Sequence, residues 1–374
     1  MTFPRVTIFI AVALSVWTLM HLYVYMRVAT VPCAVAHVPR RVLAVAMMAL
    51  WACYPLGRIL GARGMHWIAR PFEFAGAIWL GALFLLLSAL FAVDVVTLGG
   101  YLLPKIAPVA RGWAALAACV LSVAAVTQGL RQPVVREYQI ALRGLPPERD
   151  GLVLAVLSDL HLGSLIGERW IARLVGRVNA MHADAVLLVG DVVDGHVDHV
   201  EDLLHVLQEL RAPLGVWAVT GNHEYYAGAD RCVRLFEDAG YAVLRDRCAE
   251  VAPGLVFAGV DDLAARREMG IPIDPFSAML SNRPRGAVVL LSHTPARIAS
   301  AASAGAGLML SGHTHNGQLW PFNFIVRLVY RYIGGMHMID KMPLIICRGT
   351  GTWGPRMRLW RPSEFLRITL RSTP

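Results

Sequence analysis

The sequence has little charge. Only 16% of its 374 residues are Asp, Glu, Lys or Arg, whereas 56% are hydrophobic, which is too apolar for an ordinary soluble protein. The six cysteines are scattered and no C-x-x-C pair occurs, so neither a disulfide framework nor a thiolate zinc site of the usual spacing is expected. No small-residue cleavage site follows the first apolar segment, which argues against a removable secretory signal.

Four long apolar segments occupy the first third of the chain. Residues 6–26 and 72–98 approach or exceed the ~20 apolar residues that a bilayer-spanning helix needs, and residues 42–60 and 113–130 are slightly weaker candidates. Pro55 and Arg58 make the span over 42–60 the least regular. We therefore expect a multi-pass α-helical transmembrane domain of about four spans over 1–130, a linker and first strand over 131–150, and a second domain over 151–374.

The positive charge is concentrated in the apolar part. The net charge is +9, and residues 1–130 hold nine Lys and Arg against Glu73 and Asp94 alone. Arginines that flank membrane helices account for this excess, so nucleic-acid binding is not expected. With a cytoplasmic N-terminus, seven basic residues lie on the cytoplasmic side and five on the other, which favours a cell-membrane protein with its C-terminal domain in the cytoplasm. The seven are Arg5, Arg58, Arg63, Arg70, Arg131, Arg136 and Arg143; the five are Arg27, Arg40, Arg41, Lys105 and Arg111.

From residue 152 the pattern changes to short apolar runs separated by stretches of helical periodicity. The runs include "LVLAVL", "AVLLV", "VWAV", "LVFAGV", "VVLL" and "LMLS", and the helical stretches cover 167–183 and 200–212. Continuous apolar runs are typical of a partly parallel sheet that helices cover on both faces. This indicates an α/β domain, in which ligands bind beyond the carboxyl ends of the strands.

Polar residues follow five of these runs directly. A single His beside an apolar run is typical of a core or capping position, but recurrence at five strand ends indicates a functional site at one edge of one sheet. The motifs are Asp159-x-His161, Gly190-Asp191-x-x-Asp194, Gly221-Asn222-His223-Glu224, His293, and Gly312-His313-x-His315.

These residue types suit a particular kind of metal site. Carboxylate, amide oxygen and imidazole without thiolate favour Mn²⁺, Fe²⁺ or Zn²⁺ in a catalytic rather than a structural role. Two such ions about 3.5–4 Å apart require a bridging carboxylate and can act on a phosphoryl group. Alternate residues of a strand point to opposite sides, so we expect a turn begun by Gly312 to bring His313 and His315 to the same edge.

Taken together, the five motifs resemble the calcineurin-like metallophosphoesterase superfamily over essentially all of residues 150–374. The stretches "GHTHNGQ" and "RGTGTWGPRMRLWRPSE" further resemble a bacterial branch of membrane-associated phosphodiesterases similar to YkuE and YaeI. The layout with several spans also resembles transmembrane proteins with a metallophosphoesterase domain. The resemblance implies an αββα sandwich-like domain that follows the N-terminal membrane helices.

The resemblance also implies roles for individual residues. Two divalent ions, most readily Mn²⁺ with Fe²⁺ or Zn²⁺ as alternatives, would be held by seven side chains. Asp159, His161 and His315 would bind the first ion, Asp191 would bridge, and Asn222, His293 and His313 would complete the second site. His223 would be the catalytic residue that stabilises the transition state or protonates the leaving oxygen, with Asp194 orienting it.

The expected function is that of a membrane-anchored phosphodiesterase or pyrophosphatase that uses a metal-bridging hydroxide. The membrane tether suggests a lipid-linked or nucleotide-lipid phosphoester as substrate, with a soluble substrate as the alternative. Phosphomonoesterases and protein phosphatases share the motif set, so the sequence does not exclude them. A non-enzymatic membrane scaffold or transporter with a regulatory metal domain is the third possibility, although all ligands are present and few charges lie within the spans.

Five further residues are open to two interpretations each. Arg348 and Arg358 suit either phosphate binding or a fold-supporting ion pair. His196 and His199 follow the Asp194 motif and are interpreted as exposed loop residues rather than substrate contacts. Asp94, near the end of the third span, is expected at the membrane interface rather than in a buried proton relay.

Overall fold

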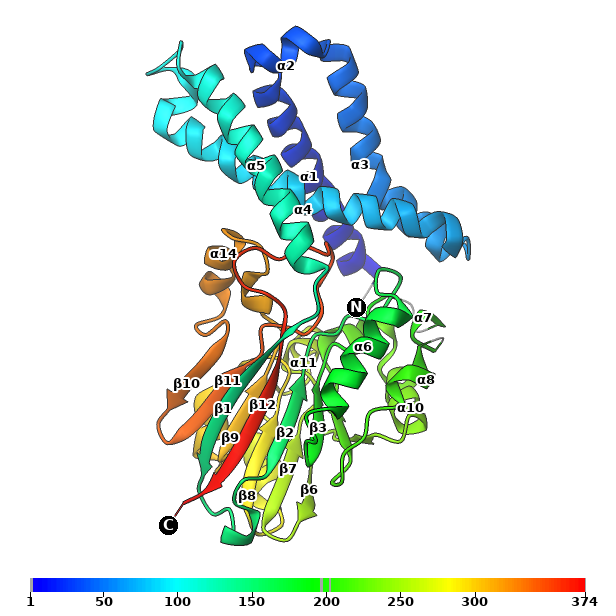
Figure 1. The fold of residues 1–374 in the computed structure, drawn as a ribbon, viewed down its shortest axis with the longest axis vertical. Coiled ribbons are helices and arrows are strands. Elements are labelled where there is room, and N and C mark those ends of the chain that lie inside the picture. The colour runs from blue at the N-terminus through cyan, green and yellow to red at the C-terminus, as the bar shows by residue number, and fades with distance from the viewer. Residues whose placement is uncertain (1–2, 196–197, 202, 374) are drawn as a thin grey trace. The chain divides into compact units, whose positions relative to one another are not determined.

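The computed structural model describes residues 3–195, 198–201 and 203–373 (Figure 1). Its internal contacts divide the chain into two compact units. One comprises Met1–Leu130 together with Gly354–Trp360, and the other comprises Arg131–Trp353 together with Arg361–Pro374.

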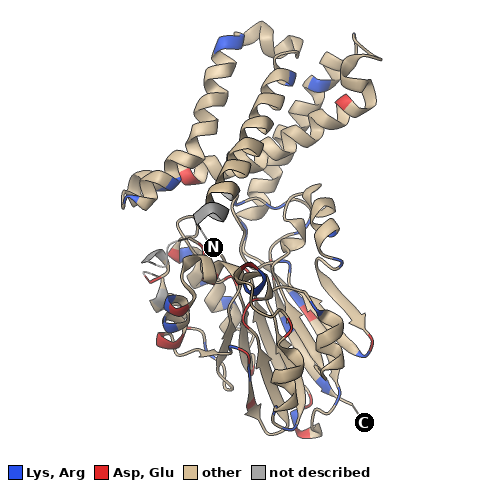
Figure 2. Ribbon diagram, turned by 180° about the vertical axis from the view of Figure 1, so that it is seen from behind, with Lys and Arg blue, Asp and Glu red and all other residues tan. Residues whose placement is uncertain are grey.

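The first unit contains four helices that are long and apolar enough to cross a membrane. They are α1 (Phe3–Val28), α3 (Arg40–Ala62), α4 (His66–Thr97) and α5 (Ala107–Gly129), with the short α2 (Pro32–His37) and η1 (Leu98–Gly100) between them. Figure 2 shows these helices almost free of charged residues except toward their ends. The prediction of four long apolar helices is confirmed, and Pro55 lies inside α3 without ending it.

One acidic side chain of this unit is buried between two arginines. Arg111 Nη2 lies 2.7 Å from Asp94 Oδ1, and Arg27 Nε lies 2.5 Å from Asp94 Oδ2. Tyr23 donates a further hydrogen bond of 2.7 Å to the same carboxylate. These partners satisfy a charge that would otherwise be costly to bury among apolar helices.

The second unit is built around two six-stranded sheets. The first has the order β1-β12-β2-β3-β4-β5 and the second β10-β11-β9-β8-β7-β6. The first sheet contains β1 (Val134–Leu142), β2 (Val153–Leu157), β3 (Ala185–Val189), β4 (Val216–Val219), β5 (Ala242–Val243) and β12 (Glu364–Ser372). The second contains β6 (Arg247–Ala252), β7 (Leu255–Gly259), β8 (Ala287–Leu291), β9 (Leu308–Ser311), β10 (Gly335–Ile339) and β11 (Met342–Ile346). Strands β2 to β5 run parallel, as do β7, β8, β9 and β11.

The expectation of a single sheet is therefore wrong. Strand β2 shows why, because Leu154 and Val156 belong to the core shared with strands of the other sheet, whereas Ala155 and Leu157 pack with α6 (Glu168–Asn179). A continuous apolar run indicates that both faces of a strand are buried. It does not show whether a helix or a second sheet packs against each face. The αββα arrangement implied by the family resemblance is confirmed.

Helices complete the outer layers, as Figure 1 shows for α6, α8 and α10 on one side of the sheets. The helix predicted over 200–212 is not continuous, since only α7 (Asp198–Glu201) and α8 (Leu204–Leu207) form there. The apolar residues of this segment are nevertheless buried: Val200, Leu203, Val206 and Leu207. The periodicity of the apolar residues therefore indicated correctly which side chains are buried, but not that they form one continuous helix. The remaining helices are η2 (Pro147–Arg149), α9 (Asn222–Ala227), α10 (Ala229–Asp238), α11 (Leu263–Met269), α12 (Phe276–Ser281), α13 (Ile298–Ser303), η3 (His315–Gly317) and α14 (Phe322–Val329).

Candidate metal centre

The polar motifs follow the carboxyl ends of strands in both sheets. Strands β2, β3 and β4 of the first sheet lead into the Asp159, Asp191 and Asn222 motifs, and β8 and β9 of the second lead into His293 and the His313 motif. The predicted convergence at one edge of one sheet is thus corrected, because the site is assembled from two stacked sheets. Their parallel strands bring the loops together from opposite sides of the shared core.

The first cluster consists of Asp159, His161 and His315, whose ligand atoms all lie within 4.8 Å of one another. The two imidazole Nε2 atoms of His161 and His315 are 3.0 Å apart. Nε2 of His315 is 3.2 Å from Asp159 Oδ1. All three side chains are buried, so three potential ligands point at a small volume shielded from solvent.

The second cluster consists of Asp191, His293 and His313. His293 Nε2 lies 3.0 Å from Asp191 Oδ2, and His313 Nδ1 lies 2.9 Å from Asn222 Oδ1. Asp191 Oδ2 is also 3.8 Å from His161 Nε2 of the first cluster. Asp191 therefore stands between the two clusters, where one carboxylate can face both.

A third group lies beside these two. His223 Nδ1 is 3.0 Å from Asp194 Oδ1, and Asp194 Oδ2 is 3.8 Å from His161 Nδ1. Burial opposes protonation of His223, but the Asp194 hydrogen bond and the charge of Asp191 outweigh it and raise the pKa of His223 to about 9. A protonated imidazole thus lies next to the clusters without belonging to the two that contain Asp159 and Asp191.

The donor set fits divalent cations. Nitrogen ligands about 2.0–2.1 Å from one ion are themselves about 3 Å apart, which matches the separation of His161 Nε2 and His315 Nε2. His161 Nδ1 is buried without a hydrogen-bond partner among the described residues, and His293 Nε2 lies 3.0 Å from the Asp191 carboxylate oxygen. Burial lowers the pKa of His161 to about 3, so its imidazole is neutral, as a ligand must be.

The two buried carboxylates are also in their ligating form. Burial opposes ionisation of Asp159, but the charge of His315 and its hydrogen bond hold the pKa of Asp159 below its ordinary value. Burial likewise opposes ionisation of Asp191, whose pKa is held well below normal mainly by His293. Burial opposes protonation of His293, but the charge of Asp191 raises the pKa of His293 well above its ordinary value, so His293 supplies positive charge that a cation would otherwise provide.

The backbone at these residues is unusual. Five of the seven predicted ligands have positive φ angles, which non-glycine residues rarely adopt: Asp159 (55°), His161 (48°), Asp191 (52°), His313 (70°) and His315 (48°). Left-handed backbone at so many site residues is typical of functional loops held by their surroundings.

This geometry corrects the expectation about Gly312. Its φ is not among the positive values, and the histidines themselves make the turn that places both at the site. Gly312 is required for another reason, because a Cβ there would collide with the Ser158 hydroxyl and the Asp159 carboxylate. The glycine permits close approach of β9 to the β2 loop rather than supplying the turn.

Glu224 is a supporting residue, and its motif did not predict a role for it. Its buried carboxylate accepts hydrogen bonds from the backbone N–H groups of Asp191 (2.9 Å), Val193 (2.9 Å) and Gly221 (2.6 Å). Burial first and the charge of Asp191 second raise the pKa of Glu224 to about 7. The signal was present, since Glu224 occupies the third helical position of a capping box that opens α9.

Two further contacts orient the histidines of the second cluster. His293 Nδ1 lies 2.8 Å from the carbonyl oxygen of Val189, which assigns the proton to Nδ1 and turns Nε2 toward Asp191. The Tyr330 hydroxyl lies 2.7 Å from His313 Nε2, leaving Nδ1 for the cluster. Hydrogen bonds of this kind fix the ring orientation of metal-binding histidines. Tyr330 belongs to none of the five sequence motifs, and only the tertiary structure places it at the site.

The other sequence candidates are Arg348, Arg358, His196 and His199. Arg348 Nη1 is 3.1 Å from Glu364 Oε2, so the fold-supporting ion pair is observed. The Arg358 side chain is fully buried, in a segment whose contacts belong to the first unit. His196 lies outside the described residues, and His199 lies in α7 with its side chain not described.

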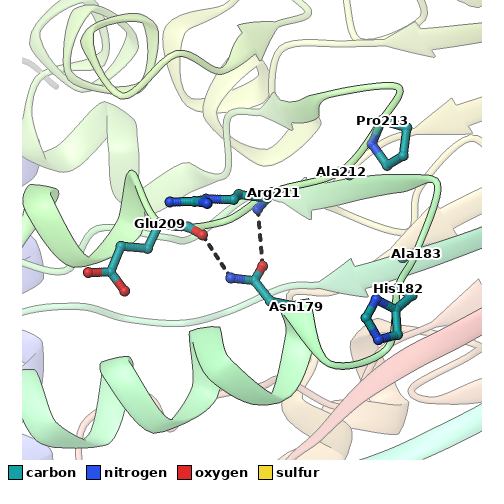
Figure 3. Close-up of a pocket in the computed structure, with 7 residues that line it drawn as sticks. All are labelled: Asn179, His182, Ala183, Glu209, Arg211, Ala212 and Pro213. Carbon is teal, nitrogen blue, oxygen red and sulfur yellow. Dashed lines mark hydrogen bonds between the residues drawn. The ribbon is translucent and has the colours of Figure 1, made fainter.

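A separate hollow of about 540 Å³ lies at the opposite strand ends, before β3 and β4 (Figure 3). There the Asn179 side chain donates to the Glu209 carbonyl oxygen at 2.8 Å and accepts from the Arg211 N–H at 3.0 Å. These hydrogen bonds join the end of α6 to the loop that enters β4. This hollow includes no member of the three clusters.

Comparison with known proteins agrees with this arrangement. Residues 152–317 match the calcineurin-like phosphoesterase family. An uncharacterized metallophosphoesterase of Aquifex aeolicus is 34% identical over 63% of this chain and 91% of its own length. A Danio rerio transmembrane protein with metallophosphoesterase domain is 32% identical over 67% of this chain. The uncharacterized metallophosphoesterase YkuE of Bacillus subtilis is 27% identical over 63% of this chain and 85% of its own length.

Some relatives are considerably longer than the matched region. The match spans 65% of the length of an uncharacterized metallophosphoesterase of Helicobacter pylori and 60% of the length of the Danio rerio protein. The resemblance inferred from the five motifs is nevertheless confirmed, including its relation to YkuE and to transmembrane members. This chain belongs to the calcineurin-like phosphoesterase family.

Proposed function

We propose that this protein is a membrane-anchored, binuclear metal-dependent phosphodiesterase or pyrophosphatase. The observation that carries the proposal is the position of Asp191 between two clusters of oxygen and nitrogen ligands, with the His223–Asp194 pair beside them. Family membership supports a metal-dependent phosphoesterase. The preference for a diester or pyrophosphate, and the residue roles below, are proposals.

Seven residues would hold the ions. Divalent ions bound here would stabilise phosphoryl charge as Lewis acids and lower the pKa of a water molecule toward neutrality. The mixed oxygen and imidazole donors suit Mn²⁺ best, with Fe²⁺ and Zn²⁺ as alternatives. The residues assigned are Asp159, His161 and His315 for one ion, Asn222, His293 and His313 for the other, and Asp191 for both.

His223 would act on the leaving oxygen. Its Nδ1 is held by Asp194 at 3.0 Å, so its Nε2 is the nitrogen available to donate a proton or hydrogen bond to substrate. Burial opposes protonation, but the Asp194 hydrogen bond and the charge of Asp191 raise the pKa of His223 to about 9, which favours the protonated ring that a proton donor needs. Because His223 would not coordinate a metal ion, its imidazole can protonate or hydrogen-bond to the leaving alkoxide or phosphate.

The substrate proposal rests on the four apolar helices. A catalytic domain on the same chain as four candidate membrane spans is held near a bilayer, which favours a lipid-linked or nucleotide-lipid phosphoester. The excess of basic residues on one side of the spans favours a cytoplasmic catalytic domain at the cell membrane. The proposals of a lipid-linked substrate and of a cytoplasmic catalytic domain are independent of the metal chemistry. Either can be wrong while the metal-dependent phosphoesterase activity is correct.

The proposal is tested with the purified full chain in detergent. Protein supplied with Mn²⁺ is assayed on bis-p-nitrophenyl phosphate and on p-nitrophenyl phosphate, with Asp191→Asn and His223→Asn as controls. We expect metal-dependent hydrolysis with the diester preferred and both controls nearly inactive. Preference for the monoester would replace the diesterase assignment with a phosphatase, and folded, metal-loaded protein that cleaves neither would refute the enzyme proposal.

A further inference from the structure

A cavity of about 670 Å³ adjoins the second cluster. Its walls come from α11, from the segment that follows His293, and from the end of α14. Tyr330 lines the cavity and also contacts His313 Nε2. A group bound in the cavity would therefore lie next to the metal centre. The residues that line the cavity include Arg267, Glu268, Arg297, Val329, Tyr330 and Arg331.

The cavity carries an excess of positive charge. Arg267, Arg297 and Arg331 line it, and all three are exposed. Glu268 is the one acidic residue among the described lining residues, and it accepts a 3.0 Å hydrogen bond from Tyr226. No ion pair is found for the three arginines within the described parts of the chain. Guanidinium groups without carboxylate partners, gathered around one hollow, are well suited to phosphate oxygens.

Helix α14 adds an apolar surface directly to this charge. Leu328 is 86% exposed and Val329 71% exposed, while Phe324 and Ile325 are also half or more exposed. Val329 belongs to the cavity wall as well, so the apolar face and the charged hollow are continuous. Contiguous exposed apolar side chains on a domain surface mark a place where an apolar ligand or partner binds.

We propose that this cavity and the exposed face of α14 together bind an anionic amphiphile. Its phosphate-bearing head lies against Arg267, Arg297 and Arg331, and its acyl chain lies along Leu328 and Val329. The volume is within the range of small-molecule sites, and the four candidate membrane spans bring the chain to a bilayer, where such molecules reside. In taking this amphiphile as the non-reacting part of the substrate, the inference rests on the function proposed above.

Binding is measured on the full chain in phosphatidylcholine nanodiscs with a chelator present, so that no hydrolysis is required. The probes are radiolabelled dihexanoyl phosphatidic acid and glycerol 3-phosphate, which share the head and differ in the chains. Arg267→Gln with Arg331→Gln removes charge, and Leu328→Ser removes apolar surface. The matched controls are Arg285→Gln, before β8 at the opposite strand end, and Met338→Ser on β10, both exposed.

We expect the wild type to bind the phosphatidic acid at least about tenfold more tightly than glycerol 3-phosphate. The double arginine variant should weaken both probes by about tenfold or more. Leu328→Ser should weaken only the acylated probe, and the controls should bind as wild type does.

Equal binding of both probes would show that the cavity binds soluble phosphate compounds, and it would refute the proposal that the ligand is an amphiphile. Loss of binding in the controls, or none in the test variants, would overturn the site itself. Because the measurement needs no turnover, a chain that binds the probe as expected but hydrolyses no phosphoester would refute the proposed function and the substrate role of the amphiphile, while the amphiphile-binding site itself would stand.

Discussion

The two sheets contribute different chemistry to the site. Loops of the first sheet supply every oxygen donor, from Asp159, Asp191 and Asn222, together with His161. Loops of the second sheet supply only imidazole, from His293, His313 and His315. Each of the two clusters takes members from both sheets. The candidate metal centre is therefore assembled only when the sheets are packed, and cations bound there would stabilise that packing by linkage.

Asp191 should be the most damaging single position on the first sheet. In Asp191→Asn the amide has no negative charge to offer either cluster, and we expect kcat/KM to fall by about a thousandfold, as loss of several kcal/mol of charge stabilisation implies. Metal content measured by plasma mass spectrometry should fall below the wild-type value as well. Activity that survives this substitution would disprove the placement of Asp191 between two ions.

His223 should separate chemistry from metal binding. We expect His223→Asn to lower kcat by about 10²–10⁴-fold, the range for loss of a general acid, while leaving metal content unchanged. Asp194→Asn removes the negative charge from the group that accepts the His223 Nδ1–H hydrogen bond, which lowers the pKa of His223. The protonated form is then lost at lower pH, so the basic limb of the pH–rate profile should move to lower pH. Metal loss in His223→Asn would instead identify it as a ligand.

The paired histidines of the second sheet should divide between the two ions. His313→Ala should weaken the ion near Asp191 and His293, and His315→Ala the ion near Asp159 and His161, each by about 10–100-fold. Both effects are measured by metal titration followed by calorimetry. If the two variants lose the same ion, the proposed division between His313 and His315 is wrong. The exposed His205, outside the three clusters, provides the matched control His205→Ala.

Glu224 should affect stability more than chemistry. In Glu224→Gln one of the two accepting oxygens becomes an NH₂ group, which cannot accept a hydrogen bond. At least one of the three backbone N–H groups then has no partner, at a cost of about 1–3 kcal/mol in the free energy of unfolding. Chemical denaturation of the full chain should show this loss. Glu237→Gln, exposed on α10, should show none. An unchanged free energy of unfolding would mean that the loops do not depend on Glu224.

The contrast between the sheets also shows what the sequence could predict. The five motifs could be found because each directly follows a run of apolar residues, and adjacency along the chain is visible in a sequence. The second sheet could not be separated from the first, because β2 and β8 are both buried on two faces and carry the same continuous apolar pattern. The left-handed backbone of His313 and His315 was also hidden, since it results from loops held by tertiary contacts.

The contact of Tyr330 with His313 could not be predicted from the sequence. Removing the Tyr330 hydroxyl should have the smallest effect of the substitutions considered. It follows His313 by 17 residues, and only the path of α14 returns its hydroxyl to within 2.7 Å of that ring. Tyr330→Phe keeps the ring and removes one hydrogen bond, so affinity for the ion that His313 serves should fall about tenfold, the lower end for such supporting contacts. The ion near His315 should bind as in the wild type. Equal weakening of both ions would show that Tyr330 supports the loop as a whole, whereas a selective loss would show that the second sheet orients its imidazoles one at a time.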